Sequence, residues 1–124
     1  MKIFAAVAVL LSLAAAAPAA AQARDPAQRQ ILIDLSRVIG EAHALRQICN
    51  GPDDQFWRSR MMSMLATEDA DFAFAERMRN AFNTGFASRK AEHLSCNAST
   101  REAEAAVSAK GQDLARRLAQ GGRP

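Results

Sequence analysis

The stretch from residue 31 to residue 49 constrains this chain most, because its apolar residues recur at helical spacing and it ends in a cysteine. These residues alternate steps of four and three along the chain, at Ile31, Leu35, Val38, Ala42, Leu45 and Cys49. Leu32, Ile39 and Ile48 widen the stripe. The spacing predicts an α-helix with one apolar face that other helices must cover. So strict a seam also allows a homodimer to form through this helix.

Residues 1–23 have the three parts of a secretory signal peptide. Lys2 supplies the positive start, Ile3–Leu13 supplies the apolar core, and A-x-A cleavage sites end at Ala21 and Ala23. A membrane anchor is the alternative, but it needs roughly 20 apolar residues, more than this core provides. We expect cleavage of this segment, a periplasmic location, and no membrane span in the mature protein.

The mature chain, residues 24–124, is long enough for one helical domain and too short for two. The full sequence has 16 basic and 13 acidic residues and a net charge of +3, and removal of Lys2 lowers this charge to +2. The two signs alternate along the chain and form no basic block. Mixed charge with few aromatic residues excludes nucleic acid as an expected partner.

Cys49 and Cys96 are the only two cysteines of the chain. In an exported protein of this size they predict one disulfide, because the periplasm is oxidising. Its closed loop would destabilise the unfolded chain by about 4 kcal/mol in the chain-entropy model. A metal or redox site is the competing interpretation, but the chain has no C-x-x-C motif.

Four amphipathic segments follow one another, and each begins near a helix-capping residue. The expected caps are Asp25, Asp53 or Asp54, Asp69 or Asp71, and Ser99, which starts a capping box with Glu102. Asn50-Gly51-Pro52 predicts the end of the first helix. The predicted fold is all-α, a small four-helix, largely antiparallel bundle with one disulfide.

The third segment, from about residue 71 to Cys96, has an apolar stripe. The expected members are Phe72, Ala75, Met78, Phe82 and Phe86, flanked by Phe74 and Leu94. Gly85 interrupts this helix and costs about 1 kcal/mol relative to Ala. It therefore marks either a close approach of another helix or a kink.

Phe56 and Trp57 lie in the first turn of the second predicted helix. One interpretation is that both close the end of the bundle beside the disulfide. The other is that they form an exposed aromatic platform that binds a partner. Both interpretations stay open at this point.

His43 and His93 are the only histidines, and each precedes one of the cysteines. A disulfide between the carboxyl ends of the first and third helices would make those helices run in the same direction. The two imidazoles would then be neighbours, and with Glu41 or Glu92 they would suit zinc. The alternative is two histidines that form hydrogen bonds at a helix surface, since no H-x-x-x-H pair is present.

The sequence shows no catalytic motif. Its serines lack a nucleophile-elbow context, and no Gly-rich phosphate loop is present. We expect a protein that is not an enzyme and needs no cofactor.

Three segments carry a resemblance: VIGEAHALRQIC (residues 38–49), QFWRSRMMSML (55–65) and FNTGFASRKAEHLSC (82–96). Over residues 30–118 the chain resembles a small exported family of alphaproteobacterial conserved hypothetical proteins. That family favours an aromatic residue where this chain has Ala44. The resemblance implies export and a helical fold with a disulfide, and it implies no activity.

Three functional hypotheses follow. The first is a non-enzymatic periplasmic protein that binds another envelope protein or helps to maintain the envelope. The second is a small holdase chaperone, because the chain is similar in architecture to the acid-stress chaperones of the bacterial periplasm. The third is a metal- or ligand-binding module that uses His43 and His93.

Overall fold

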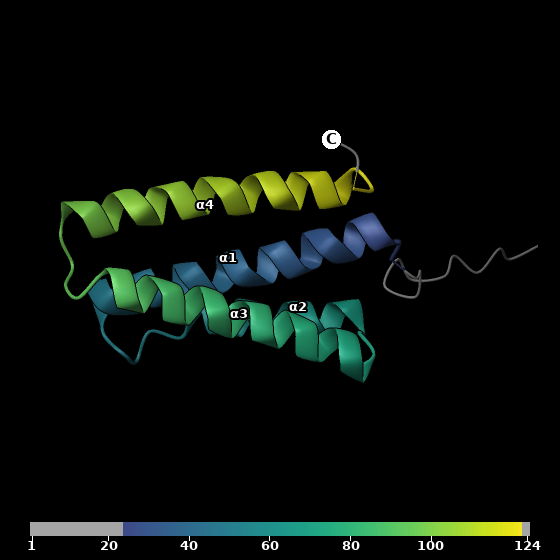
Figure 1. Cartoon of the computed structure of the whole chain (residues 1–124), viewed down its shortest axis with the longest axis horizontal. Coiled ribbons are helices and arrows are strands. Elements are labelled where there is room, and N and C mark those ends of the chain that lie inside the picture. Colours follow the sequence, from purple (N-terminus) through teal and green to yellow (C-terminus); the bar gives the residue numbers. More distant parts are fainter. Residues whose placement is uncertain (1–23, 123–124) are drawn as a thin grey trace, which may run out of the picture.

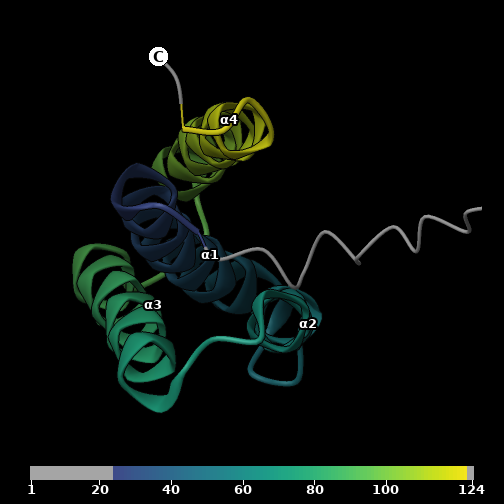
Figure 2. The same ribbon diagram turned by 90° about the vertical axis from the view of Figure 1, so that its right-hand side faces the viewer.

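Helix α1 (Pro26–Asn50) forms the centre of the molecule, and three other helices pack around it (Figures 1 and 2). The computed structural model describes residues 24–122. In this range the chain forms only helices and no strand: α1, α2 (Phe56–Glu68), α3 (Phe72–Glu92) and α4 (Ala98–Ala119). The predicted all-α, four-helix fold is confirmed. The expected signal peptide, residues 1–23, lies outside the described residues.

Consecutive helices run in opposite directions, so α1 and α3 run the same way and α2 and α4 run against them (Figure 1). Helix α1 packs most extensively against α3, then against α4, and least against α2. Figure 2 shows α4 on one side of α1, and α2 and α3 on the other. The largely antiparallel arrangement is therefore confirmed, with a parallel α1–α3 pair inside it.

The two sides of α1 build two hydrophobic clusters. The first joins α1 to α4 and consists of Ile31, Val38, Ala42, Leu45, Val107 and Leu114. The second joins α1 to α2 and α3 and consists of Leu32, Ile39, Met61, Phe74 and Met78. Leu35, Trp57 and Leu118 pack against both clusters. The wide apolar stripe of α1 is thus used on both flanks, as a central helix requires.

Two of the predicted helix caps are confirmed and two are wrong. The side chain of Asp25 accepts a hydrogen bond from the N–H of Gln28, and Asp71 accepts one from Phe74. The N-cap of α2 is Gln55, which follows the expected caps Asp53 and Asp54 and forms no side-chain capping hydrogen bond. Helix α4 is capped by Asn97, because Asn97 and Thr100 complete a reciprocal capping box two residues before the one expected from the sequence.

The predicted stripe of α3 is wrong at its first residue, Phe72, and at the flanking residue Leu94. Phe72 is 79% exposed, whereas Phe74 and Met78 are buried. Residues two positions apart lie on nearly opposite sides of a 3.6-residue helix, so burial of Phe74 turns Phe72 outward. Leu94 is 94% exposed because α3 ends at Glu92, two residues before it.

Two glycines allow the backbones of α1 and α3 to touch. A Cβ on Gly40 would overlap the backbone carbonyl of Phe82, and one on Gly85 would overlap the carbonyl oxygen of Arg37. Gly85 therefore marks a close helix approach, and α3 continues unbroken through it. Beside this crossing, the buried carboxylate of Glu41 accepts hydrogen bonds from Arg89 at 3.3 Å.

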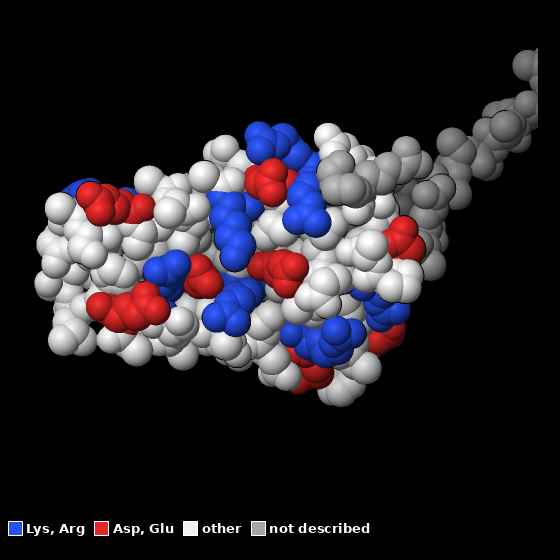
Figure 3. All heavy atoms as spheres, turned by 45° about the horizontal axis from the view of Figure 1, so that its top comes forward, with Lys and Arg blue, Asp and Glu red and all other residues white. Residues whose placement is uncertain are grey.

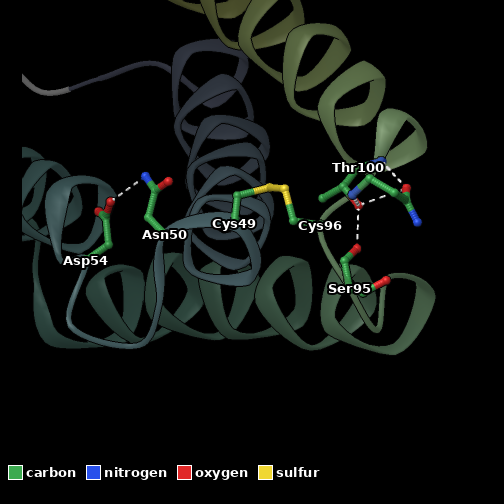
Figure 4. Close-up of a disulfide and its surroundings, with 7 residues drawn as sticks. Cys49, Asn50, Asp54, Ser95, Cys96 and Thr100 are labelled. Carbon is green, nitrogen blue, oxygen red and sulfur yellow. Dashed lines mark hydrogen bonds between the residues drawn. A yellow bond between two sulfur atoms is a disulfide. The ribbon is translucent and has the colours of Figure 1, made fainter.

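The predicted disulfide joins Cys49 to Cys96, with Cα atoms 4.8 Å apart. It links the carboxyl end of α1 to the turn between α3 and α4 (Figure 4). Next to it, the hydroxyl of Thr100 donates a 2.7 Å hydrogen bond to the carbonyl of Ser95. The first turn of α4 is thereby fixed to the same end of the α1–α3 pair.

Candidate functional site

Helix α2 is the least embedded of the four helices and borders the two grooves that form the candidate site. Met61 is its only buried residue. Ion pairs fasten the chain at both ends of α2: Asp54, which precedes α2, binds Arg46 of α1, and Glu68, the last residue of α2, binds Arg24, which precedes α1. Because α2 packs mainly on α1, it leaves open space toward α4 and toward α3.

The first groove lies between α2 and α4, with α1 as its floor, and is called the α2–α4 groove below. Its volume is about 260 Å³. Most of its lining is apolar: Leu35, Val38, Ile39, Ala42, Trp57, Val107, Gly111 and Ala115, with Ser108 and Gln112 as the polar members. Gly111 allows α4 to lie close to α1, since a Cβ at this position would lie only 3.3 Å from Val38 Cγ1. This groove is an apolar depression lined by α1, α2 and α4.

Trp57 and Phe56, the two aromatic candidates, have different environments. Trp57 is half-buried, packs against both hydrophobic clusters and forms a wall of the α2–α4 groove. Phe56 is 41% exposed and meets Trp57 edge-on, with ring centroids 5.0 Å apart. The guanidinium groups of Arg46 and Arg60 lie over the Phe56 ring at 4.7 and 5.0 Å. Trp57 therefore supports the core and lines a groove, whereas Phe56 is a surface residue.

Asp54 organises the loop that positions these two aromatic residues. Its carboxylate accepts a hydrogen bond from Asn50 at 3.0 Å (Figure 4). It also accepts hydrogen bonds from the Phe56 N–H at 3.1 Å and from Arg46 at 2.9 and 2.7 Å. These donors, the Asn50 amide foremost, hold the pKa of Asp54 below its ordinary value. The start of α2 is thereby fastened to the last turns of α1.

The second groove lies between α2 and α3 and is called the α2–α3 groove below. Its volume is about 350 Å³. The lining residues are Arg58, Met61, Met62, Leu65, Arg79, Phe82 and Asn83. Two guanidinium groups and no carboxylate line this groove, so it is positively charged, whereas no charged side chain lines the α2–α4 groove.

His43 lies inside the α1–α3 interface rather than at a surface. It is 4% exposed, and its ring lies 5.6 Å from Phe82 and 5.3 Å from Phe86. Its Nδ1 is buried without a hydrogen-bond partner. Burial, reinforced by the positive charge of Arg58, lowers the pKa of His43, so the ring is neutral at pH 7.

His93 lies apart from this aromatic stack, at the C-cap of α3. Its Nε2 is 4.0 Å from a carboxylate oxygen of Glu92. Within residues 24–122, no group of three or more His, Cys, Asp or Glu side chains is placed to hold a metal ion. The ligand set of two histidines and a glutamate considered from the sequence is therefore not assembled, because His43 packs between phenylalanine rings.

The surface is charged with both signs. On the face drawn in Figure 3, basic and acidic side chains are interspersed. Several form ion pairs, among them Arg116 with Asp113 and Arg89 with Glu92. Among the described helices, none is both long and apolar enough to cross a membrane.

The family described as protein of unknown function (DUF2385) matches residues 26–121, which contain all four helices. The chain belongs to this family. No curated protein and no solved structure matches the chain significantly. The DUF2385 match starts at the first residue of α1, so the whole helical bundle with its disulfide and its two grooves lies within the family region.

Interpretation of the sequence pattern pointed to Trp57, Phe56 and His43. It did not point to Gly40, or to Arg58 and Arg79 of the α2–α3 groove. A signal for Gly40 was present, since a glycine inside a helical pattern lowers helix stability and indicates a packing reason. The pairing of Arg58 with Arg79 had no such signal. The two residues belong to different helices, and only the packing of both helices on α1 places them along one groove.

Proposed function

We propose that the protein is a non-enzymatic periplasmic protein that binds another envelope protein, using the α2–α4 groove as its contact surface. The observation that carries this proposal is the open apolar groove walled by Trp57. Surfaces that bind proteins place aromatic and aliphatic side chains at the centre and polar groups at the rim. Here the aliphatic floor comes from α1, and the polar side chains of Ser108 and Gln112 come from α4.

The geometry favours an amphipathic helix as the bound segment. Helices α2 and α4 both run against α1, so the groove between them follows the α1 axis. A helix that lies along such a groove inserts one apolar face, with anchors at i, i+3, i+4 and i+7. The residues that floor the groove, such as Leu35, Val38 and Ala42, have the same helical spacing.

Site-specific photo-crosslinking in cells tests this proposal. A photoreactive residue at Ser108, which lines the groove, is compared with one at Ala109, an exposed neighbour outside it. We expect one dominant envelope protein crosslinked from position 108 and little from 109. An Ala115→Phe substitution, which fills the groove, should abolish that product. Equal products from both positions, or a product that survives Ala115→Phe, would contradict the proposal.

A holdase chaperone is the second candidate function, and His43 is the observation that favours it. A buried histidine without a hydrogen-bond partner at Nδ1 must become charged in acid, which opposes α1–α3 packing. The apolar residues of that interface would then be exposed to clients. The test is suppression of client aggregation at pH 5 and at pH 7. Equal activity of wild type and His43→Phe at pH 5 would exclude this role for the histidine.

A further inference from the structure

The α2–α3 groove combines an apolar floor with a basic rim. The floor consists of Met61, Leu65 and Phe82, which are buried or half-buried. Met62, at the edge, is 58% exposed and has a flexible, polarisable side chain that adapts to apolar ligands. Small-molecule sites have this composition: mostly apolar walls with a few polar groups that fix the orientation of the ligand.

Two arginines, one from each helix, give this groove its charge. Arg58 of α2 forms no ion pair within residues 24–122. Arg79 of α3 pairs with Glu76 at 3.0 Å, but both side chains are nearly half exposed. Exposed pairs of this kind contribute little free energy, so Arg79 can exchange Glu76 for another anion at small cost. No carboxylate lines the groove to neutralise either guanidinium group.

The charge and the volume together define the ligand class. A guanidinium group binds a carboxylate through two parallel hydrogen bonds. The volume of about 350 Å³ lies near the lower end of the range for small-molecule sites, roughly 300 to 1,000 Å³. A slender ligand with one alkyl chain suits this space, and a two-chain lipid does not.

We propose that the α2–α3 groove binds the anion of a fatty acid, with its alkyl chain over Met61, Leu65 and Phe82 and its carboxylate between Arg58 and Arg79. The site is separate from the α2–α4 groove, on the other side of α2. Each proposal can therefore fail without the other.

The first experiment is calorimetric titration of the purified, oxidised protein with dodecanoate below its micelle concentration. We expect saturable binding of one equivalent that weakens as salt rises, because the contacts to the carboxylate are partly screened. Dodecanol and dodecyltrimethylammonium, with the same chain length but no negative charge, should bind at least about tenfold more weakly, a difference of about 1.4 kcal/mol. Equal binding of all three ligands would overturn the proposal.

Matched variants locate the site. The double substitution Arg58→Gln with Arg79→Gln removes both groove charges, and Arg77→Gln with Arg101→Gln removes two exposed charges outside either groove. We expect the groove variant to lose about tenfold or more in dodecanoate affinity and the control variant to bind like wild type. Equal losses in the two variants would indicate a non-specific charge effect and overturn the assignment. Binding of an acidic amphipathic peptide, but not of dodecanoate, would also overturn it.

Discussion

Gly40 of α1 lies directly against the backbone carbonyl of Phe82 in α3, with no room for a side chain between them. Gly85 makes the reciprocal approach to the carbonyl of Arg37. The two glycines fix how α3 is rotated and translated on α1. That placement sets which α3 residues reach the core, the groove and the imidazole of His43.

Gly40→Ala should destabilise the protein by about 2 kcal/mol. The substitution gains about 1 kcal/mol of helix propensity, but overpacking costs roughly 1 to 3 kcal/mol, and the upper end of that range applies because the added methyl meets rigid backbone. Urea titration followed by circular dichroism measures the free energy of unfolding. Gly111→Ala is the control, since its Cβ would meet only a methyl group of Val38 at 3.3 Å. A Gly40→Ala variant more stable than wild type would refute the close approach.

His43 should make stability fall in mild acid. Its pKa is lowered in the folded protein by burial, then by Arg58 and Lys90, while Asp54 acts in the opposite direction. The unfolded chain therefore binds a proton more readily, near the ordinary pKa of 6.5, and the free energy of unfolding decreases as pH falls below that value. Below the lowered pKa of the folded state this loss is complete.

The measurement is the urea midpoint of wild type, His43→Phe and His93→Gln between pH 7.5 and pH 5. Phenylalanine keeps an aromatic ring beside Phe82 and Phe86 and cannot titrate, so His43→Phe should lose the pH dependence. His93→Gln should keep it. The same slope in wild type and His43→Phe would assign the effect to another group.

Much of this fold was predictable because its signals are local. The 4-3 stripe of α1, the cap at Asp25 and the cap at Asp71 depend on residues within one or two turns of the same helix. The Cys49–Cys96 bridge was predictable from the count of two cysteines together with the expected export.

The rest depends on contacts between helices. The sequence placed Phe72 in the core, but the rotation of α3 about Gly40 and Gly85 buries Phe74 instead. The same rotation puts Phe82 beside His43 and along the α2–α3 groove. The spacing of residues within one helix does not determine how a second helix is rotated when it packs on the first. Neither groove could therefore be predicted from the sequence.

Trp57 and Phe56 should differ sharply in their effect on stability. Trp57→Ala should lower the free energy of unfolding by about 2 kcal/mol, less than the 3 to 5 kcal/mol of a fully buried aromatic, because Trp57 is only half-buried. Phe56→Ala should cost less than about 1 kcal/mol, since it loses mainly exposed cation–π contacts with Arg46 and Arg60. Circular dichroism is the suitable probe because Trp57 is the only tryptophan. Equal losses would show that both residues close the bundle.

The disulfide should account for much of the stability of the bundle. It joins residues 47 positions apart, and a loop of that size destabilises the unfolded chain by about 4 kcal/mol. The double substitution Cys49→Ser with Cys96→Ser should lower the free energy of unfolding by that amount and retain the helical spectrum, because Gly40 and Gly85 still hold α1 against α3. Wild type in reductant is the matched control and should behave like the double variant. A loss below about 1 kcal/mol would mean that the reduced, unfolded chain already keeps α1 and α3 together.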